Sequence, residues 1–344
     1  MISGTFLEEV RGLWGCFVIG NTGGLPPDQY RLIARVSRLY HESDLTQEQI
    51  GKKLGISRMK VNRLLTLART AGIVQVRIVE HPESFGELSH RLLTAFELKD
   101  VCIVAAPLGE DGGPDEGALR SAIAAEAATW LVHWLEPNIV VGLGLGRTMS
   151  LLHESFAPNR QIDAVFTTLE GVGTSPNAGF AAYDVTSRLA DSVGGRAKIV
   201  SAPTFVSDPS LQGPLLSEPS VAASIDVARS AGIAIQSVGT VSSGATLYLH
   251  GMLTDDDLQQ LRDAGAVGDA LGHFYDDHGQ HVPWWTDNTH VGLTFDELKK
   301  LPTSALVAGG AAKVPAIRAA LRGNIFNVLI TDDVSAEMLL ELET

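Results

Sequence analysis

The sequence contains few cysteines and no long apolar run, and both absences exclude whole classes of protein. Of its 344 residues only Cys16 and Cys102 are cysteines, and neither belongs to a CxxC pair, so we expect no disulfide framework and no zinc ribbon. No apolar run approaches the roughly 20 residues that span a bilayer. The stretch LWGCFVIG is short and lacks a basic start, which argues against a signal peptide. We therefore expect a cytoplasmic protein without a membrane partner.

The chain also lacks the positive charge that nonspecific nucleic-acid binding requires, but its charges are unevenly spread. The formal net charge is -14. Residues 29–81 nevertheless contain ten basic and four acidic side chains, a net charge of +6, which leaves 16 basic and 36 acidic side chains, or -20, elsewhere. A basic module beside an acidic body suggests one domain for a polyanion and another for a different ligand.

The basic module contains three amphipathic segments. Residues 28–43, DQYRLIARVSRLYHES, predict a first helix. Residues 45–55, LTQEQIGKKLG, predict a short second helix that Thr46 caps and Gly55 ends. Residues 56–72, ISRMKVNRLLTLARTAG, predict a third helix. Two short helices joined by a glycine turn are typical of a helix-turn-helix. We assign residues 29–82 to such a DNA-binding domain, winged-helix-like if IVQVRI forms a small wing.

The start of the third helix is the candidate contact surface for operator DNA. Arginine and lysine side chains can pair with guanine edges and asparagine with adenine, while some of these side chains contact phosphates instead. We expect DNA contacts from the cap residue of this helix and from the side chains that lie off its buried stripe: Ser57, Arg58, Met59, Lys60, Asn62 and Arg63. The alternative is a small helical bundle with a solvated basic face.

Residues 1–28 match no pattern, and the sequence leaves open a flexible, disordered extension or an artefact of the assigned start.

From residue 83 to residue 344 the sequence alternates between strand-like and helical segments. Apolar runs such as DVCIVAA, NIVVGLGLG, IAIQSVG and NVLITD are each followed by a helical pattern. This alternation predicts an α/β domain with a mostly parallel sheet. Ligands of such sheets bind beyond the carboxyl ends of the strands. The candidate binding loops are therefore residues 142–148, 169–174, 239–245 and 309–313.

The loop VGLGLGRTMS, residues 141–150, is the clearest candidate site. Gly142, Gly144 and Gly146 let the backbone approach a ligand, and a following helix would offer N–H groups to an anion. Arg147 adds a charged fork and Thr148 a hydroxyl. The GxGxG spacing fits neither the dinucleotide fingerprint GxGxxG nor the P-loop GxxxxGK[ST]. A tight turn with Arg147 in a salt bridge is the alternative.

Five stretches carry a resemblance to a known family: LTQEQIGKKLGISRMKVNRLL, VGLGLGRTMS, LADSVGGRAKIVSAPTFVSD, GAVGDALGHFYDDHG and VAGGAAKVPAIRAALRGNIFNVLITDDVSAEMLL. From about residue 29 to its end the chain resembles the SorC family of sugar-responsive bacterial transcriptional regulators. The resemblance implies a Rossmann-like effector domain similar to sugar-phosphate isomerases and deaminases, with catalysis lost. It also implies phosphorylated sugars or polyols as effectors, homo-oligomers (usually tetramers) and operators near catabolic genes.

Three further residues complete the expected effector site. Asp269, in GAVGDALGHFYDDHG, has a carboxylate that can accept hydrogen bonds from sugar hydroxyls, or it caps a turn. Lys313, after AGGAA, meets a phosphate or sugar oxygen, or lies on an exposed first turn. Glu170 departs from the neutral polar residue that the family more often has, and a carboxylate would repel a phosphate. This departure favours a polyol. Leu145 also replaces an aromatic residue that the family often carries.

These observations predict a DNA-binding regulator, a repressor of carbohydrate or polyol catabolism genes. The alternative function is a sugar-phosphate isomerase or deaminase, which would need an acid/base pair drawn from Asp184 and the two carboxylates above. A purely structural DNA-binding protein would not explain the large α/β body. We expect no cofactor and no metal. His273, His278 and His281 match no metal-ligand spacing. The resemblance to the SorC family implies a polar hairpin at this place instead.

Overall fold

The chain divides into two compact units, residues 1–82 and residues 83–344. The computed structural model describes residues 26–43, 45–74, 85–109, 112–172 and 178–343. The predicted extension therefore lies outside the described residues except for its last three positions, and the predicted wing lies outside them from residue 75 onward.

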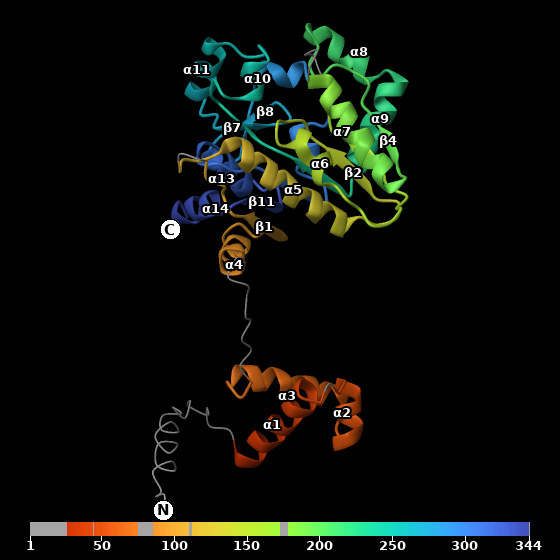
Figure 1. Cartoon of the computed structure of the whole chain (residues 1–344), viewed down its shortest axis with the longest axis vertical. Helices are drawn as coiled ribbons and strands as arrows, with labels where there is room; N and C mark the ends of the chain where they lie inside the picture. The colour runs from red at the N-terminus through yellow and green to blue at the C-terminus, as the bar shows by residue number, and fades with distance from the viewer. Residues whose placement is uncertain (1–25, 44, 75–84, 110–111, 173–177, 344) are drawn as a thin grey trace, which may run out of the picture. The chain divides into compact units, whose positions relative to one another are not determined.

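The first unit is built from three helices around a small apolar core. They are α1 (Pro27–His41), α2 (Gln47–Leu54) and α3 (Arg58–Thr70), coloured red to orange in Figure 1. Helix α1 begins two residues before the predicted domain boundary, because proline is well suited to the first position of a helix. The core residues are Ile33, Val36, Ile50, Val61, Leu64, Leu65 and Ala68.

Seven strands in the described part of the second unit form one sheet in which every neighbouring pair is parallel. Their order is β1-β11-β10-β5-β2-β3-β4, which confirms the predicted α/β class. Strands β2 to β4 extend the sheet in one direction, and β5, β10 and β11 extend it in the other. The strands are β1 (Asp100–Val104), β2 (Val140–Leu143), β3 (Val165–Thr168), β4 (Arg196–Lys198), β5 (Ile233–Gln236), β10 (Thr303–Val307) and β11 (Val328–Asp332).

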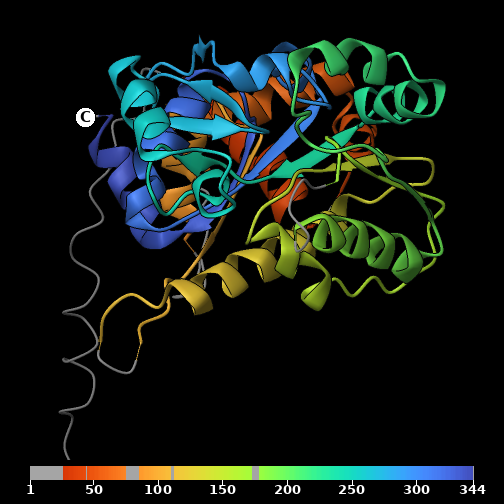
Figure 2. The same cartoon turned by 90° about the horizontal axis from the view of Figure 1, so that it is seen from above.

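Helices cover both faces of this sheet. One core cluster packs the sheet against α5 (Glu116–Trp134), α6 (Leu152–Ser155) and α7 (Ala178–Val193). A second core cluster includes side chains of α4 (Gly86–Ala95), α9 (Pro219–Arg229), α12 (Phe295–Leu298), α13 (Val314–Arg322) and α14 (Asp333–Glu341). Figure 2 shows α5 and α7 along one side of the sheet and the blue C-terminal helices along the other. The body is thus a three-layer sandwich.

A second, four-stranded antiparallel sheet follows β5 and was not predicted as strands. Its order is β6 (Gly239–Thr240), β7 (Gly268–Ala270), β8 (His273–Tyr275) and β9 (His281–Val282). Strands of two or three residues are too short for an alternating pattern to be read. The pairing of β8 with β9 confirms the polar hairpin. The remaining helical segments are α8 (Gln212–Leu216), α10 (Thr246–Leu249), α11 (Asp255–Asp263), η1 (Met149–Leu151), η2 (Pro209–Leu211), η3 (Trp285–Asn288) and η4 (Ala311–Lys313).

Asp332 ties the end of β11 to two other elements. It is buried, and as the N-cap of α14 its Oδ1 accepts the N–H of Ser335 at 2.9 Å. Its Oδ2 accepts the N–H of Gly310 at 2.9 Å and the hydroxyl of Ser335 at 2.7 Å. One carboxylate therefore holds the helix start and the loop after β10 together.

We expect Asp332→Ala to lower the free energy of unfolding by about 2 kcal/mol, because a helix cap is lost and a buried N–H is left without its partner. Urea unfolding followed by circular dichroism measures the change. Asp296→Ala is the control, since Asp296 is exposed in the first turn of α12, and it should change stability by less than about 0.5 kcal/mol. Equal stabilities of the two variants would contradict this role of Asp332.

Candidate functional site

Helix α3 presents one exposed polar face. Its apolar side chains pack against α1 and α2, whereas Arg58, Met59, Lys60, Asn62 and Arg63 are all exposed. Met59 is 83% exposed. A single exposed apolar side chain is ordinary, so the distinguishing feature of this face is its three basic side chains, Arg58, Lys60 and Arg63.

The turn between α2 and α3 depends on two glycines. Gly55 ends α2 in the left-handed region, with φ of 67°. A Cβ on Gly51 would lie 2.7 Å from the carbonyl oxygen of Ile56, so only glycine lets the chain cross this closely. Thr46 forms a capping box with Gln49, and the Ser57 hydroxyl accepts the N–H of Lys60 at 3.2 Å. Local sequence thus fixes both helix starts, and Ser57 is a cap as predicted.

The second unit contains a cavity of about 740 Å³ at the carboxyl ends of its central strands. The loops after β2, β3, β5 and β10 all contribute lining residues. Strand order reverses between β2 and β5, and such a switch point opens a crevice because the two connections leave in opposite directions. Seven of the eight predicted effector residues line this cavity: Gly144, Gly146, Arg147, Thr148, Glu170, Asp269 and Lys313.

Gly142 is the exception, and its assignment to the ligand site is corrected. It lies within β2, paired with Thr167 and Ala234, and is not among the lining residues. A Cβ at this position would approach Leu169 to 2.3 Å. Gly142 is therefore needed for packing. Gly144 meets a similar constraint from Gln236 but also lines the cavity.

The loop after β2 differs from the expected strand-to-helix anion site. In place of the helix expected to follow the glycines stands a 3₁₀ turn, η1, followed by the four-residue α6. The N–H of Gly144 already donates to the carbonyl of Ile235 at 2.9 Å. A helix this short contributes little dipole to an anion at its start. Arg147 is exposed and donates to the carbonyl of Gly244 at 3.1 Å, in place of the salt bridge considered as an alternative.

Lys313 lies in the cavity wall and is not an exposed first-turn lysine. Its Nζ donates to the carbonyl of Val238 at 2.9 Å and to the hydroxyl of Ser237 at 3.2 Å. The pKa of Lys313 is lowered to about 8, chiefly because the ammonium is buried and also because the positive charge of Arg147 acts on it. Burial and the nearby guanidinium therefore both disfavour the charged form of Lys313, and an anion bound beside it would favour that form.

The two predicted carboxylates of the cavity are both buried. Burial raises the pKa of Asp269 to about 6, although the N–H of Gly272, which donates to its Oδ2 at 3.2 Å, opposes this shift. Asp269 thus caps a turn and also faces the cavity. Glu170 Oε2 lies 3.2 Å from Nε2 of His290. Burial lowers the pKa of His290, so at neutral pH a neutral imidazole donates to Glu170.

Two charged residues of the cavity wall were missed by sequence reasoning. Glu116 and Arg120 begin α5 and line the cavity, with Arg120 Nη1 3.3 Å from Glu116 Oε2. In the sequence they look like an ordinary i,i+4 surface pair. Conversely, Asp184 forms an ion pair with Arg188 at 2.6 Å and does not line the cavity.

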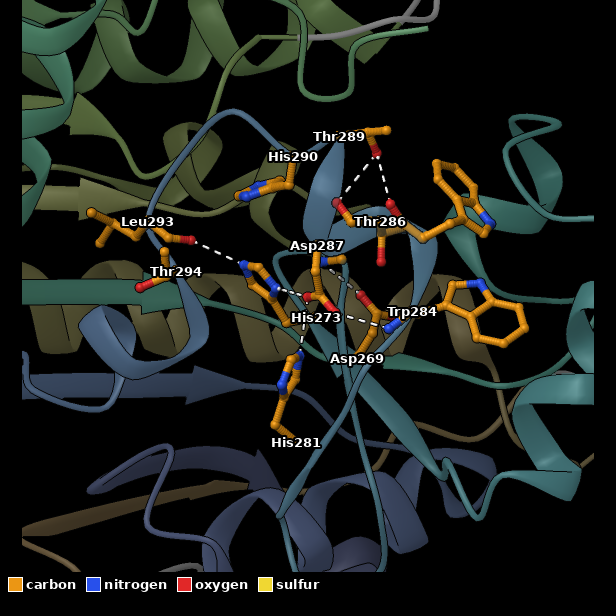
Figure 3. A network of polar contacts seen from close by, with 12 residues as sticks. Asp269, His273, His281, Trp284, Thr286, Asp287, Thr289, His290, Leu293 and Thr294 are labelled. Atoms are coloured by element: carbon orange, nitrogen blue, oxygen red, sulfur yellow. Dashed lines mark hydrogen bonds and ion pairs between the residues drawn. The ribbon is translucent and has the colours of Figure 1, made fainter. Parts of the chain in front are cut away.

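Two of the remaining candidates, His273 and His281, lie together beside the cavity. His273 and His281 converge on Asp287, a residue that the sequence did not single out, as Figure 3 shows. Trp284 and Trp285 do not line the cavity, and the ring of Trp285 packs against Phe205 with 6.1 Å between centroids. The ring of Trp285 therefore packs beside the cavity and is not part of its wall.

Comparison with known proteins extends over both units. A sugar-binding domain family (Sugar-bind) matches residues 80–341, and region 4 of sigma-70 matches residues 23–71. The transcriptional regulator LsrR of Enterobacter sp. (strain 638) is 32% identical over 93% of this chain and 95% of its own. The erythritol catabolism regulatory protein EryD of Brucella abortus is 30% identical over 90% and 96%.

Solved structures share the fold. The full-length sorbitol operon regulator SorC from Klebsiella pneumoniae superposes with a TM-score of 0.66, at 24% identity, covering 91% of this chain and 99% of that one. The sugar-binding domain of a transcriptional repressor from Vibrio fischeri gives a TM-score of 0.67 at 25% identity, over 75% and 99%. No helix in the described part of the chain is long and apolar enough to cross a membrane.

Proposed function

The chain belongs to the SorC family of sugar-responsive transcriptional regulators, and we propose that it is a repressor whose operator binding is controlled by a sugar phosphate. The observation that favours a phosphorylated effector is the group of three cationic side chains in the cavity wall: Arg120, Arg147 and Lys313. The carboxylates of Asp269 and Glu170 would accept hydrogen bonds from its hydroxyl groups. A free polyol is the alternative effector, and the name of EryD supports a short polyol skeleton.

The DNA-binding role falls to the exposed face of α3. We propose that Arg58, Lys60, Asn62 and Arg63 contact bases or phosphates in a major groove, with Met59 against a thymine methyl. One helix-turn-helix covers one half-site, so we propose a homo-oligomer, a dimer or a tetramer, acting in the cytoplasm. Repression is supported by the relative from Vibrio fischeri, which is described as a repressor.

The proposed function does not include catalysis. The relatives are transcriptional regulators. Of the three carboxylates considered for acid/base chemistry, Asp184 is held by Arg188 outside the cavity. Turnover assays with erythritol 4-phosphate and sorbitol 6-phosphate should detect no isomerisation or elimination.

The double variant Arg58→Ala, Arg63→Ala should bind DNA at least 30-fold more weakly, because each lost contact contributes about 1–3 kcal/mol. Fluorescence anisotropy with duplexes selected by this protein from a random library measures the change. The salt dependence of binding should also flatten by about one ion per lost phosphate contact. The matched control is Arg188→Ala, Arg196→Ala, which removes two exposed arginines of the body. DNA affinities equal to the control would refute the role of α3.

Arg147→Ala should weaken effector binding about 10- to 100-fold while DNA binding stays intact, since a charge-assisted hydrogen bond contributes about 1.5–3 kcal/mol. Calorimetry with erythritol, sorbitol and their phosphate monoesters provides the measurement. Arg188→Ala is the control, as it removes an arginine outside the cavity. An unchanged response to the effector would eliminate this loop as the sensor.

The affinity for a phosphate monoester should fall as pH rises from 8 to 9.5, by up to about tenfold per unit. The pKa of Lys313 is about 8, so the lysine loses its positive charge over this range, whereas the phosphate is already a dianion. Lys313→Met should bind more weakly and show a flat profile. A neutral polyol should also give a flat profile with the parent protein, so a flat profile with the phosphates too would overturn the choice of an anionic effector.

A further inference from the structure

A cluster of two histidines and one aspartate, of which His273 is buried, lies beside the cavity. His273 begins β8, His281 lies on β9 and Asp287 lies on η3. Asp287 Oδ1 is 2.7 Å from Nδ1 of His273 and 3.0 Å from Nε2 of His281. The carboxylate therefore lies between the two imidazole rings (Figure 3). The side chain of His273 is 6% exposed and that of Asp287 is 21% exposed.

The hydrogen bonds of His273 do not balance if the ring is neutral. Its Nε2 lies 3.1 Å from the carbonyl oxygen of Leu293, which can only accept, so Nε2 must carry a proton. A neutral imidazole then has a lone pair on Nδ1, and that lone pair faces Asp287 Oδ1, which is also an acceptor. Two acceptors at 2.7 Å repel each other. A positive charge must lie between them, carried either by a second proton or by a metal ion.

We propose that His273, His281 and Asp287 bind a Zn²⁺ ion, with water in the fourth position. Two imidazoles and one carboxylate are an established donor set for zinc. A metal-binding histidine usually donates its other ring N–H to a carbonyl or carboxylate, and the Leu293 carbonyl accepts that N–H here. This proposal departs from the sequence expectation of no metal, because the ligand Asp287 follows His281 at no recognised motif spacing.

The geometry requires only small movements. Donors 2.0–2.2 Å from zinc at tetrahedral angles lie about 3.4 Å apart. The present separations of 2.7 Å and 3.0 Å must therefore open by about 0.7 Å and about 0.4 Å. His281 is the outermost ligand, with a side chain that is 34% exposed, so an ion can enter from that side.

The ion would join the β8–β9 hairpin of the second sheet to η3. His273 follows Gly272 directly, and Gly272 lines the effector cavity and donates to Asp269. Zinc would cross-link the β8–β9 hairpin to η3 and so fix this wall of the cavity. The proposal itself concerns metal binding alone and stands apart from the identity of the effector.

The test uses the full chain after dialysis against a chelator, with Co²⁺ as a spectroscopic probe and Zn²⁺ as its competitor. We expect one Co²⁺ per chain with the visible absorption bands of a four-coordinate site, which Zn²⁺ abolishes. Zn²⁺ should also raise the melting temperature. His281→Ala should weaken binding by at least about 100-fold, because loss of a direct ligand costs no less than loss of an outer-shell partner. His281→Ala removes a partly exposed side chain and is the variant least harmful to folding.

His278→Ala is the matched control, since His278 lies in the same hairpin but contacts Asp277 instead. It should bind Co²⁺ like the parent chain. Loss of binding in His278→Ala with retention in His281→Ala would overturn the proposal and place the ion at the hairpin tip. Absence of stoichiometric binding by the parent chain would also overturn it and leave a doubly protonated His273 as the source of the positive charge. Asp287→Asn, folded by circular dichroism, must show the same loss as His281→Ala.

Discussion

The reversal of strand order between β2 and β5 is the constraint on which the cavity depends. Chain connections leave these two neighbouring strands in opposite directions, so the loops after them cannot close over the same space. The close approach of Gly144 to Gln236 keeps the two strand ends packed, because any Cβ on Gly144 would come within 2.4 Å of Gln236. The rest of the site is arranged around this opening.

Tertiary contacts hold charged side chains of the cavity in place, and burial shifts the pKa values of Lys313 and Asp269. Lys313 is fixed by the oxygens of Ser237 and Val238, and its pKa is lowered by burial and by Arg147. Asp269 is buried, and its pKa is raised to about 6. Such costs destabilise the empty protein, and the sugar phosphate proposed as the effector would recover them on binding. The same buried charged side chains therefore set the electrostatics of the cavity and the kind of ligand proposed for it.

The small antiparallel sheet positions several polar residues at or beside the cavity. It brings Asp269 to the cavity and places His273 and His281 on the two strands of one hairpin. A site that fixes this sheet would act directly on the cavity wall, because Gly272 belongs to both. Ligand affinity and metal occupancy could then be coupled through one short segment of chain.

The sequence alone determined the helix-turn-helix, the α/β body and the loops that line the cavity. Capping residues such as Thr46 and Ser57 and the alternation of apolar runs act locally, so their effects are visible in the order of residues. Only the tertiary structure decided that Gly142 is a packing residue, that Arg120 reaches the cavity and that Asp287 joins His273 and His281. These facts depend on contacts between elements distant in sequence. Strand register and helix packing set such contacts, and no local pattern encodes them.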